Sequence, residues 1–225
     1  MRINYCLPII KNNKAEIIEI IEKNISEFQF FEVWLDYVDE LDEIFMEKLI
    51  NLLGERLIVL FRRQKLEAIN MDLEKRFDII ALISNSKAFL DLDISQVLEL
   101  RHIERNKIDL NLILSCHNYQ ETPSVKELEE IINNMKQYNP SIFKIACLCN
   151  NEDDAIKLLQ LQRLLKQQDK KHIVLGMGKF GTVTRVFGTL FGNEMVFAPI
   201  DVFESSAEGQ LTKHELERVF EILNT

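Results

Sequence analysis

Several features that mark special classes of protein are scarce in this sequence. Glycine (7), proline (4) and cysteine (4) are few among the 225 residues, and tryptophan occurs once. Low glycine and proline contents argue against collagen-like, low-complexity and disordered chains, while an apolar content of 47% suffices for a core. No linker or low-complexity tract divides the chain. The sequence therefore predicts one ordered domain spanning residues 1–225.

Long apolar runs and surplus positive charge are also missing. No stretch approaches the roughly 18 apolar residues of a membrane-spanning helix. The first residues, MRINYCLPIIKNNK, have neither the apolar segment nor the cleavage site of a secretory signal. The formal net charge of −9 disfavours nucleic acids and anionic membranes as partners. We expect a cytoplasmic protein with reduced thiols and with no nucleic-acid or membrane partner.

Short β-rich segments alternate along the chain with amphipathic ones. The expected strands cover residues 3–9, 30–38, 57–61, 89–94, 110–117, 142–148, 172–178 and 195–200. The clearest helical patterns cover 14–28, 124–138, 153–168 and 212–224, the last with Thr212 as N-cap and Glu215 three residues later. Strict alternation predicts parallel strands with right-handed crossovers. This count matches an α/β fold of the (β/α)8 TIM barrel type, with an open doubly wound sheet as the alternative.

Polar side chains fall near the carboxyl ends of the expected strands, where barrels of this type build their active sites. The set consists of Glu32, Trp34, Asp36, Arg62, Arg63, Asp91, Asp93, His117, Lys144, Met177, Arg185, Ser206 and Gln210. If the barrel closes, these side chains converge on one cavity.

Lys144 interrupts the apolar run SIFKIACLC and has two interpretations. Its stem can lie on apolar surface while its ammonium reaches water. Alternatively, it is held inside, where apolar surroundings favour the neutral amine that forms a Schiff base. His117, on the preceding strand, is either an ordinary strand-end polar residue or a general acid/base facing Lys144.

Alternation along strands separates the cysteines from these residues. If His117 and Lys144 point inward, Cys116, Cys147 and Cys149 point outward towards the helices. The Cys-x-Cys spacing is not that of a zinc site, and no histidine cluster completes it. We therefore expect packing roles for the cysteines and no metal.

Taken together, these segments resemble the type I 3-dehydroquinate dehydratase family over most of the chain. LSCHNYQETPS is similar to the family's S-x-H-[DN]-[FY]-x-x-T-P, and MKQYNPSIFKIA to the segment that carries its lysine. GMGKFGTVTRVFG resembles M-G-x-x-G-x-x-S-R, SSAEGQL resembles S-A-P-G-Q, and EVWLD resembles E-x-R-x-D.

The resemblance implies a dehydration of 3-dehydroquinate to 3-dehydroshikimate in the shikimate pathway, without a cofactor. Lys144 would form an imine with the C3 ketone, and His117 would move the protons. By the same resemblance, Glu67 would orient His117.

Substrate-binding roles also follow from the resemblance. Arg185, Ser206 and Gln210 would hold the carboxylate side of the substrate, and Glu32 and Arg62 would hold ring hydroxyls. The family is often dimeric, so a homodimer is consistent with the resemblance.

Some residues depart from the family pattern. Trp34 replaces an arginine, Glu208 replaces a proline, and FRRQKLEAIN lacks the usual glycines, so Arg62 and Arg63 compete for one role. These departures keep two other hypotheses open. One is another Schiff-base lyase of the class I aldolase type, and the other is a homologue that binds with weakened catalysis.

Overall fold

The computed structural model describes residues 3–61 and 68–223. Arg62, Arg63 and Glu67 lie outside the described residues, so the predictions made for them stay predictions.

The strands alternate with helices in the predicted order. They are β1 (Tyr5–Ile9), β2 (Phe30–Trp34), β3 (Leu57–Leu60), β4 (Phe89–Asp93), β5 (Asn111–Asn118), β6 (Ile142–Leu148), β7 (His172–Met177) and β8 (Val196–Phe197). They form one sheet in the order β7-β6-β5-β4-β3-β2-β1-β8. The pairs β1–β2, β2–β3, β3–β4 and β6–β7 are all parallel, as the alternation predicts.

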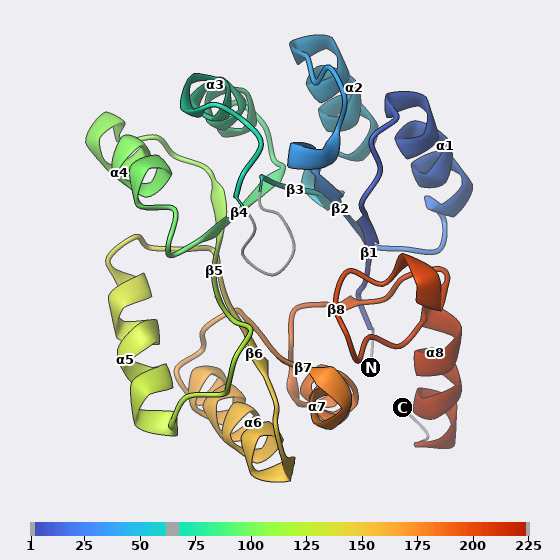
Figure 1. The fold of residues 1–225 in the computed structure, drawn as a ribbon, viewed down its shortest axis with the longest axis vertical. Helices are drawn as coiled ribbons and strands as arrows, with labels where there is room; N and C mark the ends of the chain where they lie inside the picture. The colour runs from blue at the N-terminus through green and yellow to red at the C-terminus, as the bar shows by residue number, and fades with distance from the viewer. Residues whose placement is uncertain (1–2, 62–67, 224–225) are drawn as a thin grey trace. The chain divides into compact units, whose positions relative to one another are not determined.

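Each strand is followed by a helix (Figure 1). The helices are α1 (Lys14–Asn24), α2 (Glu43–Leu53), α3 (Leu73–Ser84), α4 (Val97–Asn106), α5 (Val125–Lys136), α6 (Glu152–Gln167), α7 (Gly178–Phe191) and α8 (Lys213–Ile222). Short 3-10 turns cover Leu35–Tyr37 (η1), Gly54–Arg56 (η2) and Val202–Glu204 (η4). Within the described residues, no helix combines the length and apolarity needed to cross a membrane.

Local sequence signals explain where several helices begin. Thr212 and Glu215 form the predicted capping box at the start of α8, and Ser124 and Glu127 form another at α5. In both, the hydroxyl accepts from the N3 amide while the glutamate accepts from the N-cap amide, so two donors at the helix start are satisfied.

The chain divides into two compact units. One comprises Cys6–Ile113, and the other comprises Leu114–Thr225 together with Met1–Tyr5. In the first unit, α1 to α4 lie outside β1 to β4 (Figure 1). Its apolar core includes Phe31, Leu49 and Ile80, each at 0% exposure.

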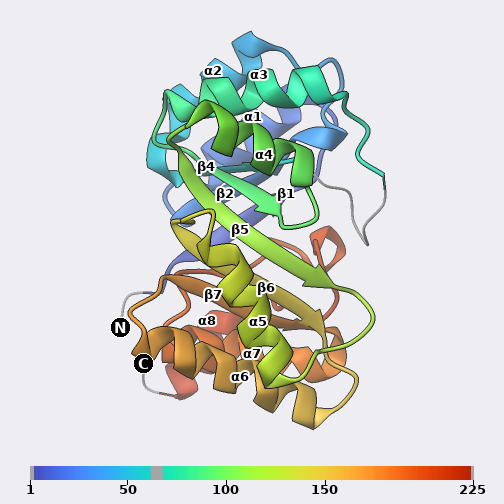
Figure 2. The same ribbon diagram turned by 90° about the vertical axis from the view of Figure 1, so that its left-hand side faces the viewer.

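In the second unit, α6 and α7 pack against β7, the neighbour of β6 (Figure 2). The segment around β8 is bonded on both sides. Glu194 N donates to His172 O at the start of β7 over 2.9 Å, and Val196 N donates to Asn4 O, just before β1, also over 2.9 Å. The segment around β8 therefore joins the start of β7 to the residues just before β1 within this unit.

Three expected boundaries differ from the structure. β2 ends at Trp34, so Asp36 lies in the turn η1 and not on the strand face. β8 ends at Phe197, shortly before Pro199, which has no N–H for a further ladder bond. β7, expected to run to residue 178, ends at Met177, and Gly178 begins the helix α7, which carries Arg185.

Candidate active site

Lys144 lies in the middle of β6 and is only 4% exposed. Its register partner on β7 is Ile173, which is fully buried. The amine nitrogen Nζ lies 4.3 Å from the centre of the Phe197 ring on β8. The side chain therefore stays within the protein, against an aromatic ring, and the snorkelling interpretation is wrong.

His117 lies near the end of β5, the neighbour of β6 in the sheet. Its imidazole is half-buried and lies parallel to the Tyr119 ring, with centroids 6.0 Å apart and planes 22° apart. Lys144 and His117 thus come from adjacent strands, as the sequence predicted. The partial exposure of the imidazole is compatible with proton exchange.

The four cysteines are free thiols, three buried and one half-buried. Burial raises the pKa of the Cys147 thiol well above its ordinary value, and the neighbouring thiols of Cys116 and Cys149 act in the same direction. Burial also raises the pKa of Cys149. The thiols of Cys147 and Cys149 therefore stay protonated near neutral pH, which suits packing better than nucleophilic chemistry.

Arg185 is a buried cation on α7, with 2% of its surface exposed. Among the described residues, neither Nε nor Nη2 has a hydrogen-bond acceptor. Burial lowers the pKa of this guanidinium to about 10, although the nearby Cys149 thiol opposes the shift. The group is still charged at neutral pH. Buried charged N–H groups that lack acceptors within the described residues are costly, so this position favours an incoming anion.

Close backbone contact with β7 fixes the depth of α7. A Cβ added to Gly176 would lie 2.6 Å from Gly181 Cα, so a side chain there has no room. Thr184 Oγ1 accepts from Gly176 N over 2.7 Å and donates to Gly181 O over 2.6 Å. These contacts hold the helix turn that carries Arg185.

Ser206 and Gln210 contact each other in the segment that precedes α8. Ser206 N donates to Gln210 Oε1 over 2.9 Å, and Gln210 Nε2 donates to Ser206 Oγ over 2.8 Å. The same segment docks on the start of α7, where Gly178 N donates to the carbonyl of Glu208 over 3.1 Å. The Glu208 side chain itself is exposed, so its carboxylate points into solvent.

Glu32 belongs to the other compact unit, where it is buried at 2% exposure. Its Oε2 accepts a hydrogen bond of 2.9 Å from the indole nitrogen of Trp34, which is also buried. Asp91 and Asp93 are buried on β4 in the same unit. Within residues 3–61 and 68–223, no group of three or more acidic, histidine or cysteine side chains is arranged to hold a metal ion.

Two neighbours of the predicted residues were not foreseen. Phe197 covers the Lys144 amine, and Cys149 lies beside Arg185, with Thr122 Oγ1 at 3.8 Å from its sulfur. Phe197 lies 53 positions after Lys144 in the chain, and nothing local marks the pair. The contact arises because the segment before β8 hydrogen-bonds to the start of β7, which lies beside β6.

A family model and curated relatives of this chain name the same enzyme family. A family model described as Type I 3-dehydroquinase matches residues 5–225. A 3-dehydroquinate dehydratase of Alkaliphilus oremlandii is 28% identical over 243 residues, which cover 97% of this chain and 91% of that protein.

Solved structures support the fold. The crystal structure of 3-dehydroquinate dehydratase from Geobacillus kaustophilus superposes with a TM-score of 0.85 at 22% identity and covers 100% of this chain and 92% of that one. A type I 3-dehydroquinate dehydratase from Clostridium difficile, with covalently modified comenic acid, has a TM-score of 0.82 at 23% identity, with 99% and 92% coverage. The predicted (β/α)8 TIM barrel is confirmed, and the open doubly wound sheet is wrong.

Proposed function

Because this chain belongs to the type I 3-dehydroquinase family and is thereby a hydro-lyase, we propose that it forms a Schiff base with 3-dehydroquinate at Lys144. The product is 3-dehydroshikimate, released with one water molecule. No cofactor takes part in the proposed cycle.

The reaction proceeds through covalent catalysis in balanced steps. The Lys144 amine adds to the C3 ketone, and loss of water gives a protonated imine. This cation accepts the electron pair released when His117 removes a proton from C2. His117 then returns a proton to the C1 hydroxyl, which leaves as water when the C1–C2 double bond forms. Water hydrolyses the imine and frees the lysine.

One observation carries this mechanism. Lys144 is 4% exposed in an apolar strand, and its amine lies against Phe197 rather than in bulk solvent. A lysine is almost never buried in this way without a chemical or pairing role. A desolvated amine is also the form that enzymes use for imine chemistry.

Arg185 supports the choice of a carboxylate substrate. Its buried guanidinium has two nitrogens, Nε and Nη2, that lack acceptors within the described residues, and a planar fork matches a carboxylate in bidentate geometry. We assign Ser206 and Gln210, already linked by two hydrogen bonds, to the same side of the substrate.

The remaining assignments concern the ring hydroxyls and the base. Glu32 and Arg62 bind hydroxyls, with Arg63 as the competitor of Arg62, and Glu67 orients His117. We also propose that residues 1–225 act as one catalytic domain, in the cytoplasm. The homodimer expected from the resemblance is a separate proposal, tested by sedimentation of the purified chain.

Borohydride trapping tests the mechanism directly. Sodium borohydride added with saturating 3-dehydroquinate reduces the imine to a secondary amine, and peptide mass spectrometry locates the added mass. We expect the adduct on Lys144 alone. The exposed Lys170 gives the matched control, because Lys170→Ala should trap as wild type does while Lys144→Ala traps nothing. Folded wild-type protein that yields no adduct on Lys144 would sink the mechanism.

A second assay separates the reaction from other Schiff-base lyases. The conjugated enone of 3-dehydroshikimate absorbs in the ultraviolet, and its appearance reports dehydration. We expect wild type to produce it and Lys144→Ala to lose it. Carbon–carbon cleavage without enone formation would indicate an aldolase, and tight binding without turnover would indicate a binding homologue.

A further inference from the structure

Trp34 and Glu32 form a buried hydrogen-bonded pair on β2. They are two residues apart, so their side chains leave the strand on the same face. The indole N–H donates to Glu32 Oε2 over 2.9 Å, and the exposed fractions are 5% for Trp34 and 2% for Glu32.

The neighbouring strands give this carboxylate an apolar setting. In the sheet register, Glu32 lies opposite Pro8 on β1 and Ile58 on β3, and Trp34 lies opposite Leu60 on β3. All three of these neighbours are buried. Burying a carboxylate among such groups is costly without hydrogen-bond donors, and Trp34 supplies one from the carboxylate's own strand.

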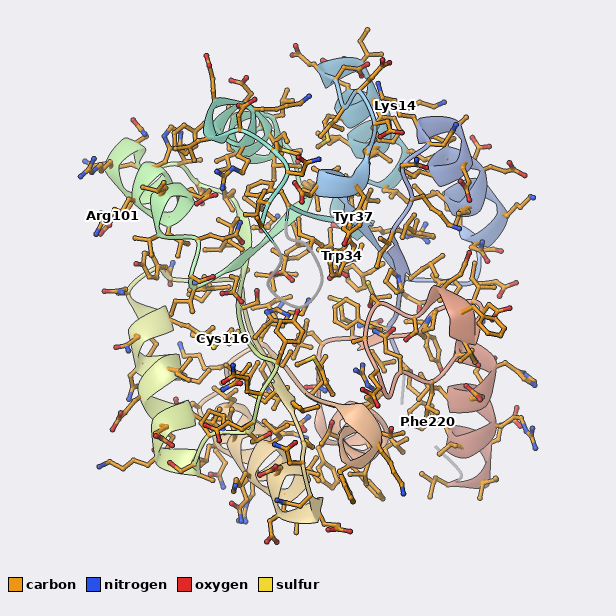
Figure 3. The ribbon with its side chains drawn as sticks, viewed as in Figure 1. Lys14, Trp34, Tyr37, Arg101, Cys116 and Phe220 are labelled. Carbon is orange, nitrogen blue, oxygen red and sulfur yellow. The ribbon has the colours of Figure 1, made fainter. Side chains whose placement is uncertain are left out.

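Packing holds the indole in the position from which it donates. Its ring meets the Tyr37 ring edge to face, with centroids 6.2 Å apart and planes 64° apart. Trp34 is the last residue of β2 and Tyr37 is the last residue of η1, and the two labelled side chains lie close together (Figure 3). An edge-to-face pair of this kind restricts rotation of both rings, so the N–H direction is set before any ligand arrives.

We infer that Trp34 is a positioning residue that fixes the Glu32 carboxylate for binding a substrate hydroxyl. This inference rests on the function proposed above. Because the indole is neutral, it orients the carboxylate without cancelling the negative charge that strengthens a bond from a hydroxyl. Trp34 thus takes a part in substrate recognition that does not require it to touch the substrate.

The chain's single tryptophan allows a test that leaves packing almost unchanged. Expression in a tryptophan auxotroph supplied with 3-(benzothiophen-3-yl)alanine replaces the indole N–H with sulfur at position 34 alone. We expect the KM for 3-dehydroquinate to rise about tenfold, with kcat within about twofold, because one bond to a charged group is lost. Substitution with 5-fluorotryptophan keeps the N–H and should leave both constants near those of wild type.

A double-mutant cycle shows whether the effect passes through Glu32. In the Glu32→Gln background, the benzothiophene analogue should change KM by less than about twofold, because the carboxylate that it positions is gone. Thermal unfolding of each protein verifies folding, and Trp34→Phe provides a second, genetically encoded loss of the N–H.

The outcomes separate this inference from the proposed function. Wild-type protein that fails to dehydrate 3-dehydroquinate contradicts the proposed function and removes the premise. Normal wild-type turnover combined with an unchanged KM in both the analogue and Trp34→Phe overturns the role of Trp34 alone. An equal KM effect with and without the Glu32 carboxylate also overturns it, because Trp34 would then act independently.

Discussion

Glu32 on β2 and Arg185 on α7 are buried side chains of opposite charge, and they differ in their hydrogen-bond partners. At β2, the Glu32 carboxylate accepts a hydrogen bond from Trp34 on its own strand. At α7, two nitrogens of the Arg185 guanidinium, Nε and Nη2, have no acceptors among the described residues. Both side chains are 2% exposed, so the difference lies in their partners and not in their depth.

The contrast shows how one chain can prepare two kinds of recognition. A carboxylate held by a protein donor is oriented before the substrate arrives, so little ordering remains to be done on binding. Buried guanidinium nitrogens that lack acceptors among the described residues lower the stability of the empty protein, and a ligand carboxylate recovers that free energy on binding. The Glu32 carboxylate is oriented before the substrate binds, whereas Nε and Nη2 of Arg185 gain acceptors when the substrate binds.

The largest expected effect comes from replacing Arg185. Arg185→Met should lower kcat/KM for 3-dehydroquinate by roughly 100-fold or more, because the substrate carboxylate loses its fork. The same change should raise the free energy of unfolding by about 1 kcal/mol or more, since an apolar side chain replaces a buried charge. Steady-state kinetics and urea unfolding measure the two quantities.

Arg185→Lys serves as the matched variant, because it keeps a charge without the planar fork. Its kcat/KM should fall between those of wild type and Arg185→Met. A methionine variant that is less stable than wild type would show that Arg185 is satisfied in the empty protein, and the contrast with Glu32 would disappear.

The carboxylate at β2 should respond with the opposite sign. Glu32→Leu leaves the buried Trp34 N–H without its acceptor, so the free energy of unfolding should fall by about 2 kcal/mol. Glu32→Gln keeps an acceptor oxygen and should lose less. Urea titrations of the three proteins give the comparison, and a leucine variant more stable than wild type would place Glu32 in the same category as Arg185.

His172 gives the smallest of the three effects and tests an unpartnered nitrogen with no proposed ligand. Its Nε2 is buried without a partner among the described residues, and its Nδ1 lies 2.6 Å from Lys170 O. Burial lowers the pKa of His172 below its ordinary 6.5, against the opposing influences of the Lys170 carbonyl and the Glu194 charge.

The sign of the pH dependence follows from that shift. The unfolded chain binds a proton more readily than the folded one, so stability is full above pH 6.5 and falls as the pH drops below it. His172→Asn, which keeps a donor for Lys170 O, should remove about 1 kcal/mol of this acid-dependent loss. The exposed His214 provides the control, because His214→Asn should leave the slope unchanged. Parallel slopes for wild type and His172→Asn would contradict the prediction.

Much of the fold could be predicted because its signals are local. The alternation of strand and helix patterns and the Thr212–Glu215 capping box depend on residues close in sequence, and both are confirmed. The extension of β2 to residue 38 was wrong because an alternating pattern continues into η1, where the chain turns although Asp36 stays buried.

Strand order was enough to predict which site residues lie on neighbouring strands. It could not predict contacts between segments that are far apart in the sequence. Lys144 and His117 on adjacent strands followed from counting strands. The ring of Phe197 over Lys144 and the thiol of Cys149 beside Arg185 join distant segments, and no spacing rule connects them. The roles of Arg62 and Glu67 stay predictions, since both lie outside the described residues.

The backbone contact between Gly176 and Gly181 limits how this region can change during evolution. Most core contacts can drift, because a larger side chain on one side is offset by a smaller one opposite. Here no side chain separates strand from helix, so no such exchange is available. In a saturation library, Gly176 and Gly181 should therefore tolerate no substitution. Exposed positions on the outer face of α7 should accept substitutions. The position of the Arg185 side chain thus depends on Gly176 and Gly181, which have no part in the proposed reaction.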